Sequence, residues 1–363
     1  MKILNIVGAR PNFIKIAPLM EEMKKDAKIK PVLVHTGQHY DYEMSKVFFR
    51  NLSIPKPDYN LAIGSKEPVL QIAKIMEKLD KVFKKEKPDL VLVVGDVNST
   101  LGGALAANKS SIPLAHVESG LRSFDFNMPE EINRVLTDHI SDYLFTTEPS
   151  ATKNLRKEGI KKEKIFFVGN VMIDTLLKYR KKALEPPFVK KSGLKPKNYA
   201  VLTLHRPENT DKKAVFKEIL EALGEIQKQI KIIWPVHPRT RKQLKEFNFL
   251  RKIKQMENLK LIMPLGYLEM LSLSSQSKFV LTDSGGIQEE TTVLKIPCLT
   301  LRKNTERPIT VQAGTNEIVG LKKGNIIKKS SEILKGRVKR GEMPFLWDGK
   351  ASKRIIKILR NRF

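Results

Sequence analysis

The residues best suited to chemistry surround a glycine pair in the second half of the chain: Ser284, Gly285, Gly286 and Glu290. The apolar run 279–282 directly before them predicts a buried parallel strand, and a helical pattern follows. Glycines allow close approach to the backbone, and the N–H groups of a first helical turn favour an anion such as phosphate. Glu290, one turn further on, could accept hydrogen bonds from ribose hydroxyls. A tight turn without a ligand is the alternative for so short a motif.

Three carboxylates stand out in the first half of the chain. Asp96 and Glu118 each follow an apolar run, and Glu130 comes after a proline that opens a helical pattern. Carboxylates close together could divide general acid and base work, because repulsion and burial move their pKa values apart. The alternatives are a turn for Asp96, an ion pair with Arg122 or Arg134 for Glu118, and a helix N-terminus for Glu130.

Basic residues at comparable positions could bind a diphosphate. His205 follows an apolar run and precedes Arg206. A lone histidine at a strand end is more often structural. With the adjacent cation and the predicted phosphate site, however, a functional role and a structural role are favoured about equally. Arg10, Lys15 and Arg307 are further cations that could face a diphosphate.

The sequence supports no metal site and no redox cofactor. Among the six histidines, His35 and His39 have the spacing of a helical zinc pair, but they fall on a strand end and a glycine turn with no carboxylate between them. Neither a Walker A loop nor a full Gly-x-Gly-x-x-Gly fingerprint is present, so a nicotinamide enzyme is not indicated.

Composition narrows the class of protein. The 363 residues carry a net charge of +28, which raises a nucleic-acid hypothesis. Lysines are spread over the chain, and only 7% of residues are aromatic, without a basic stacking platform. We therefore interpret the charge as a surface that attracts anionic small molecules. No apolar run approaches the length of a membrane span, no signal peptide is evident, and Cys298 is the single cysteine, so we expect a cytoplasmic protein.

Apolar runs and helical patterns alternate along the whole chain and must position these residues. This alternation predicts parallel sheets covered by helices, whose ligands bind beyond the carboxyl ends of the strands. The polar residues named above fall there in both halves, so we expect two doubly wound parallel-sheet domains facing a central cleft. The expected strands are residues 3–7, 32–35, 90–94, 114–117, 143–146, 165–168, 200–204, 232–234, 259–262, 279–282 and 297–301.

The domain boundaries follow from the same pattern. We expect a first Rossmann-like domain in residues 1–180 that carries the carboxylates, and a second one in 199–346 that carries the glycine pair. The stretch 181–198, rich in proline and lysine, predicts a linker. Residues 347–363 predict a terminal helix, whose packing partner the pattern does not fix.

Taken together, the motifs resemble the non-hydrolysing UDP-N-acetylglucosamine 2-epimerase family. The matching segments occur in family order and cover nearly the whole chain, so their combination is very specific. They are Gly8-Ala9-Arg10-Pro11 with Lys15, Thr36-Gly37-Gln38-His39, Gly95-Asp96, residues 116–122, residues 129–134, His205-Arg206, residues 283–290 and Thr305-Glu306-Arg307-Pro308. Two positions depart from the family pattern: Pro207 replaces a common arginine, and Met270 stands where many relatives carry an aromatic residue.

The resemblance implies roles for single residues. It implies a glycosyltransferase-B-like fold with UDP mainly on the second domain and a terminal helix that packs back on the first. The family's proposed catalytic residues correspond to Asp96, Glu118, Glu130 and His205. The residues that correspond to nucleotide, sugar and regulatory binding positions are Arg10, Lys15, Gln38, His39, Ser284, Gly285, Gly286, Glu290 and Arg307.

The resemblance also implies the reaction. UDP-N-acetylglucosamine and UDP-N-acetylmannosamine would interconvert at C2 by elimination and re-addition of UDP, without metal or cofactor, in polysaccharide biosynthesis. It further implies a homodimer and a regulatory, allosteric site for UDP-N-acetylglucosamine. A hydrolysing relative that releases N-acetylmannosamine is the nearest alternative. By resemblance, Gln38-His39 favours the non-hydrolysing branch instead. A glycosyltransferase of the same fold is a weaker one, and a nucleic-acid-binding module is the alternative from another class, with strongly salt-dependent binding.

Overall fold

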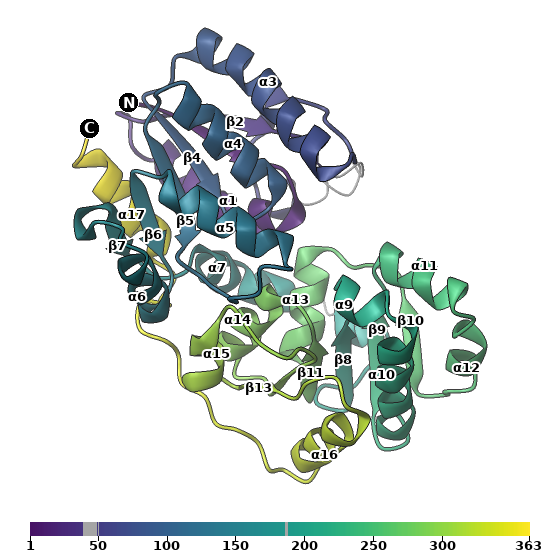
Figure 1. The fold of residues 1–363 in the computed structure, drawn as a ribbon. Coiled ribbons are helices and arrows are strands. Elements are labelled where there is room, and N and C mark those ends of the chain that lie inside the picture. The colour runs from purple at the N-terminus through teal and green to yellow at the C-terminus, as the bar shows by residue number, and fades with distance from the viewer. Residues whose placement is uncertain (39–48, 50, 186–187) are drawn as a thin grey trace. The chain divides into compact units, whose positions relative to one another are not determined.

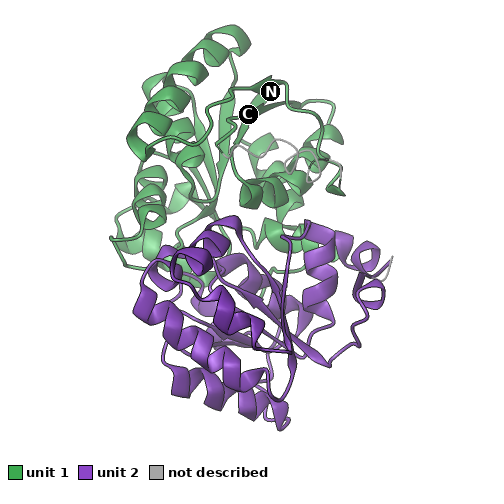
Figure 2. Ribbon diagram, turned by 90° about the vertical axis from the view of Figure 1, so that its right-hand side faces the viewer, with its two compact units in different colours: residues 1–178, 345–363 green, residues 179–344 purple. Residues whose placement is uncertain are grey.

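The computed structural model describes residues 1–38, 49, 51–185 and 188–363 and divides the chain into two compact units. Unit 1 comprises Met1–Lys178 with Phe345–Phe363, and unit 2 comprises Tyr179–Pro344 (Figure 2). The stretch in which we expected a linker contains the end of one helix and a short second helix. No helix in the described ranges is long and apolar enough to cross a membrane.

Unit 1 is built on a parallel sheet of seven strands in the order β3-β2-β1-β4-β5-β6-β7. The strands are β1 Lys2–Val7, β2 Lys30–His35, β3 Tyr59–Asn60, β4 Leu90–Val94, β5 Leu114–Ser119, β6 Tyr143–Thr146 and β7 Ile165–Phe167. The helices are α1 Arg10–Lys24, α3 Pro68–Glu86, α4 Asn98–Lys109, α5 Pro129–His139, α6 Pro149–Lys157, α7 Val171–Leu184, which continues into unit 2, and α17 Ala351–Arg360. Helices α3, α4 and α5 lie side by side on one face of the sheet, and α1 packs against α17 (Figure 1).

Unit 2 repeats this plan with six parallel strands in the order β10-β9-β8-β11-β12-β13. The strands are β8 Tyr199–Thr203, β9 Lys231–Pro235, β10 Leu259–Ile262, β11 Phe279–Thr282, β12 Cys298–Thr300 and β13 Asn316–Ile318. The helices are α8 Phe188–Lys191, α9 Pro207–Thr210, α10 Lys213–Ile226, α11 Pro238–Glu246, α12 Leu250–Lys254, α13 Tyr267–Ser275, α14 Gly285–Leu294, α15 Pro308–Gln312 and α16 Lys323–Leu334.

The central strands of both units are continuous apolar runs because helices bury them on both faces. Residues of β4 such as Val91 and Val93, and residues of β11 such as Phe279 and Leu281, are completely buried. In each unit the strand order reverses next to such a strand, between β1 and β4 and between β8 and β11. Doubly wound sheets bind ligands at this switch point, beyond the carboxyl ends of the strands.

The helix near the chain's end, α17, is anchored to unit 1 at its first turn. The carboxylate of Asp174 on α7 accepts hydrogen bonds from the backbone N–H groups of Ala351 at 3.1 Å and Ser352 at 2.7 Å. The Ser352 hydroxyl donates to the same carboxylate at 2.7 Å. The indole N–H of buried Trp347 donates to the carbonyl of Thr147 at 2.9 Å. The two backbone bonds to Asp174 satisfy N–H groups that a helix start leaves without partners.

Candidate functional site

Several of the sequence-predicted site residues lie at the two switch points. In unit 1, Arg10 begins α1 after β1, and Asp96 follows β4. In unit 2, His205 follows β8, and Ser284 with Gly285 lies between β11 and α14. The sheet topology therefore brings residues from distant parts of the sequence to one edge within each unit.

A buried ion pair joins two of the predicted residues in unit 1. Lys15 on α1 and Glu118 on β5 are separated by 2.5 Å from Nζ to Oε2, and their side chains are 3% and 1% exposed. Glu118 has a left-handed φ of 73°, at a shift in the register between β5 and β6. A non-glycine residue there costs free energy, so the surrounding contacts must hold it. A Cβ on Gly95 would lie 2.8 Å from the Lys15 ammonium, so glycine leaves room for the pair.

Asp96 is held by a second cation rather than by a turn alone. Arg134 on α5 lies 2.5 Å from Asp96 Oδ2 through Nη1, and it also pairs with the buried Glu131 at 2.8 Å. Glu131 accepts the backbone N–H groups of Ser123 and Phe124. Burial opposes its ionisation, but these hydrogen bonds and Arg134 outweigh burial and lower the pKa of Glu131.

The two arginines considered as alternative partners for Glu118 form ion pairs with other carboxylates. Arg122 pairs with buried Asp138 at 2.7 Å and with Glu158 at 2.7 Å, and Arg134 pairs with Asp96. The alternative interpretation of Glu118 named an arginine partner, whereas the cation found at 2.5 Å is Lys15. Asp138 also lies 2.7 Å from His116 Nδ1, so this strand-end histidine belongs to a structural network.

The remaining predicted residues of unit 1 occupy different surroundings. Glu130 is partly buried in the first turn of α5, as its alternative interpretation required. The side-chain oxygen of buried Gln38 accepts hydrogen bonds from the backbone N–H of Ser99 at 3.0 Å and its hydroxyl at 2.6 Å. Gln38 thus caps the start of α4. His39 lies outside the residues that the structure describes.

In unit 2, Asp283 organises the segment that follows β8. Its Oδ2 accepts the backbone N–H groups of His205 and Arg206, each at 2.9 Å, and Oδ1 lies 2.9 Å from His205 Nδ1. Burial opposes ionisation of Asp283, but the imidazole and the backbone donors outweigh it and lower the pKa to about 2. The His205 side chain is 42% exposed.

Arg307 is fixed by two buried carboxylates beside the glycine pair. Its Nε lies 2.9 Å from Glu289 Oε1, and its Nη1 binds Glu306. A Cβ on Gly285 would collide with the Arg307 guanidinium. Glycine at this position therefore makes room for an arginine, which our interpretation of the motif as a site of ligand approach did not anticipate.

Glu290 is a buried carboxyl with an unusual affinity for its proton. Burial raises its pKa to about 7, and neighbouring Glu289 adds to the shift, while a hydrogen bond from Tyr267 partly offsets it. Glu290 lies on α14 and is 3% exposed. Its charge therefore changes near neutral pH.

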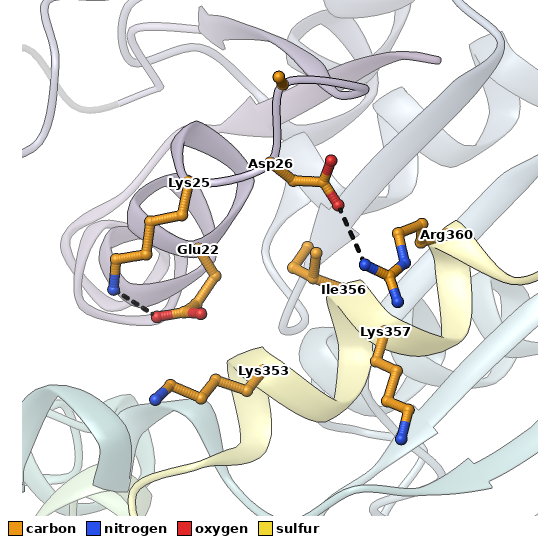
Figure 3. A pocket seen from close by; sticks show the side chains of 8 residues that line it. Glu22, Lys25, Asp26, Lys353, Ile356, Lys357 and Arg360 are labelled. Atoms are coloured by element: carbon orange, nitrogen blue, oxygen red, sulfur yellow. Dashed lines mark hydrogen bonds and ion pairs between the residues drawn. The ribbon is translucent and has the colours of Figure 1, made fainter.

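A separate cavity of about 450 Å³ lies between the far end of α1 and α17 (Figure 3). Side chains of both charges line it, including Lys25 and Glu22, which pair at 2.7 Å, and Lys353 and Lys357 of α17. None of the sequence-predicted residues lines it, so it is not part of the candidate site.

Comparison with known proteins assigns the chain to a family. A family model described as UDP-N-acetylglucosamine 2-epimerase matches residues 21–360. The chain belongs to the UDP-N-acetylglucosamine 2-epimerase family. A UDP-N-acetylglucosamine 2-epimerase homolog of Methanococcus maripaludis is 49% identical over 99% of this chain and 100% of its own length. The UDP-2,3-diacetamido-2,3-dideoxy-D-glucuronate 2-epimerase of Pseudomonas aeruginosa is 42% identical over 99% of both chains.

Solved structures of the epimerase family share the fold. The UDP-GlcNAc 2-epimerase of Methanocaldococcus jannaschii, in complex with UDP-GlcNAc and UDP, superimposes with a TM-score of 0.93 at 47% identity, over 99% of this chain and 100% of the other. The two parallel-sheet α/β domains expected from the sequence, with the glycosyltransferase-B-like fold, are thereby confirmed.

Sequence reasoning missed several charged residues of this epimerase-family chain. Glu131 and Asp138 in unit 1 and Glu289 and Glu306 in unit 2 are buried. Asp138 contacts His116 and Arg122, and the three glutamates pair with arginines. Glu131 and Glu289 each stand beside a predicted carboxylate in the sequence, Glu130 and Glu290. Helical periodicity separates buried Glu131 from partly exposed Glu130, but it does not separate Glu289 from Glu290, which is also buried.

Proposed function

We propose that this protein is a non-hydrolysing UDP-N-acetylglucosamine 2-epimerase, which interconverts UDP-N-acetylglucosamine and UDP-N-acetylmannosamine. The observation that carries the proposal is the division of charge between the units. Unit 1 presents Asp96 and Glu118, each within 2.5 Å of a cation. Unit 2 presents His205 and Arg307 beside a strand-to-helix turn that suits phosphate. The reaction requires carboxylates for the sugar and cations for the diphosphate.

The proposed reaction is an elimination followed by an addition. A carboxylate of the Asp96, Glu118 and Glu130 set removes the proton from C2 while the C1–O bond to UDP breaks, which leaves a C1–C2 double bond. A protonated group then delivers a proton to the other face of C2, and UDP oxygen re-forms the bond to C1. His205 stabilises the departing diphosphate. Atoms and charge balance without an oxidant or a hydrolytic water.

Nucleotide binding is assigned to unit 2 in this proposal. Ser284, Gly285 and Gly286 precede or begin α14, whose N-terminal N–H groups suit the diphosphate. Glu290 accepts the ribose hydroxyls, and Arg307 neutralises a phosphate. Arg10, Lys15, Gln38 and His39 contribute to binding on the side of unit 1, where a regulatory UDP-N-acetylglucosamine molecule would also bind.

The identity of the sugar has a specific competitor. The relative of Pseudomonas aeruginosa, at 42% identity over nearly the whole chain, is named for a substrate with a second acetamido group and a carboxylate. A net charge of +28 suits such an additional anion. Relative turnover of the two UDP-sugars therefore decides which substrate this chain uses.

We also propose that the protein forms a homodimer. Apolar side chains are exposed at the start of α3, with Val69 at 78% and Leu70 at 56%, and on α5, with Ile132 at 42% and Leu136 at 46%. A second copy would bury these faces. Sedimentation should give twice the chain mass of 41.4 kDa, and Leu70→Glu with Leu136→Glu should convert it to the monomer. A wild-type monomer at working concentration would contradict the proposal.

Product analysis tests the proposed activity. The purified protein is incubated with UDP-N-acetylglucosamine alone, and the anomeric protons are followed by NMR. We expect UDP-N-acetylmannosamine to accumulate to a fixed ratio that is also reached from the opposite direction. Free N-acetylmannosamine with UDP would show the hydrolysing activity instead, and no change would show that this is not the substrate.

A further inference from the structure

Asp283 divides its two carboxylate oxygens between different tasks. Oδ2 accepts three N–H groups, those of the His205 and Arg206 backbones and the side chain of Asn209, the last at 3.1 Å. Oδ1 is buried and lies 2.9 Å from Nδ1 of the His205 ring, an ion-pair contact whose angles fall outside those of a regular hydrogen bond. One oxygen thus fixes the backbone of the segment, and the other meets the imidazole.

We propose that Asp283 is a positioning residue that holds the His205 imidazole through Nδ1, so that Nε2 is the ring nitrogen that acts on the departing diphosphate. This inference rests on the proposed function and deepens it. It assigns a role to a residue that does not itself contact the substrate.

The physical reason lies in the two tautomers of imidazole. A carboxylate accepts but does not donate, so the ring hydrogen stays on Nδ1 and the proton exchanged with a ligand is on Nε2. The negative charge also favours the imidazolium form, whose Nε2–H can donate to a phosphate oxygen as the C1–O bond breaks. Asp283 stays ionised at the pH values at which an imidazole gains or loses a proton, because its own pKa is lowered to about 2.

Other charged groups near the His205 ring either disfavour its protonated form or affect it less than Asp283 does. The Arg206 cation is adjacent, and its guanidinium lies 3.7 Å from Glu208 and 3.4 Å from buried Glu306. The ring of His237, at the start of α11, has its centroid 5.9 Å from that of His205. Arg206 and a charged His237 would disfavour the imidazolium, so direct contact with Asp283 is what keeps that form accessible.

The first test is made on the wild-type protein and needs no activity. With 15N-labelled histidine, long-range proton–nitrogen NMR reports the tautomer and titration of each of the six histidines. His205, assigned by its loss in His205→Gln, should carry its hydrogen on Nδ1 when neutral. A neutral ring with its hydrogen on Nε2 would overturn the inference, whatever the protein turns over.

The second test is a double-mutant cycle in turnover. Asp283→Asn should lower kcat by roughly 10- to 100-fold, shift the pH profile of kcat, and change the KM for the UDP-sugar little. In a His205→Gln background the same change should cost almost nothing, because Asp283 acts through the ring. Equal losses in both backgrounds would show a merely structural role. Asn209→Ala, which removes a donor to Oδ2 and to the Leu301 carbonyl but leaves Oδ1 in place, should keep the His205 tautomer.

Discussion

The ammonium nitrogen of Lys15 lies 2.5 Å from the Glu118 carboxylate, and both side chains are almost completely excluded from water. A buried ion pair of this kind is satisfied only as a pair, because either charge alone would be left without compensation. The pair also fixes a candidate catalytic carboxylate against a cation, at a backbone position with a left-handed φ. Stability and turnover are therefore coupled at this site.

Glu118→Gln should lower both stability and turnover. Removing one partner of a buried pair costs about 3–5 kcal/mol in the free energy of unfolding, and the reaction loses a carboxylate. Lys15→Met together with Glu118→Gln should recover most of the stability but no activity. Urea unfolding and turnover measure the two effects. The rise in melting temperature with UDP should persist, because the proposed reaction places Glu118 at the sugar and not at the nucleotide. A single variant as stable as the wild type would contradict the buried pair.

UDP binding should depend on pH through Glu290. Its pKa of about 7 lies above the ordinary value of 4.5, and ribose hydroxyls bind the ionised form better. UDP affinity should therefore rise as pH increases through 7, with uptake of UDP releasing a proton below that pH. Calorimetry in buffers of different ionisation enthalpy measures this release, and Glu290→Gln should abolish it.

The same shift has the opposite effect on the stability of the unliganded protein. The stabilising contribution of protonated Glu290 is complete below 4.5, the value for an unfolded chain, and is lost as pH rises through 7. An affinity for UDP that is flat between pH 6 and 8 would contradict the assignment of Glu290 to the ribose.

Gly285→Ala should disturb Arg307. The added methyl group would overlap the guanidinium, which cannot move without leaving Glu289 and Glu306. We expect a lower melting temperature and a reduced UDP-dependent shift. Gly324→Ala on α16 is the matched control, because its Cβ would meet no atom within 4 Å. That variant should keep the UDP effect and change the free energy of unfolding little, because Gly324 lies in the first turn of α16. An unchanged UDP response in Gly285→Ala would contradict a nucleotide site at this turn.

Asp174→Ala should loosen α17. The carboxylate accepts two backbone N–H groups and a hydroxyl at the start of that helix, and loss of such a cap costs about 0.5–2 kcal/mol. Limited proteolysis should cleave the terminal segment sooner, and the urea midpoint should fall. Asp348→Ala, which removes an exposed ion pair with Arg354, should change the midpoint little. Equal effects of the two changes would show that the Asp174 cap is unimportant.

Buried central elements could be predicted from the sequence with their full bounds. The apolar runs that became β4, β6 and β11 match the structure residue by residue, because strands covered on both faces are uninterrupted in hydrophobicity. The edge strand β10, in which Lys260 is exposed, also has its predicted bounds. Strands β3 and β13, of two and three residues, were missed. Each is short and contains asparagine, so neither leaves a hydrophobic pattern.

Charge partners could not be predicted, because they depend on which helix faces which strand edge. Asp96 and Glu118 were predicted as site residues, yet their cations Arg134 and Lys15 were assigned to other partners or to the diphosphate. Gly285 was correctly placed at a turn, but the atom that requires its missing side chain belongs to Arg307, which follows on a different loop. Only the three-dimensional fold supplies such pairings.

The central claim, elimination and re-addition at C2, is tested most directly by isotope exchange. The protein is incubated with UDP-N-acetylglucosamine in deuterium oxide, and both UDP-sugars are examined by NMR and mass spectrometry. We predict that UDP-N-acetylmannosamine carries deuterium at C2, and that the recovered substrate acquires it as the reaction reverses. Product that forms with its original C2 hydrogen retained would contradict the account, because no proton would then have left that carbon.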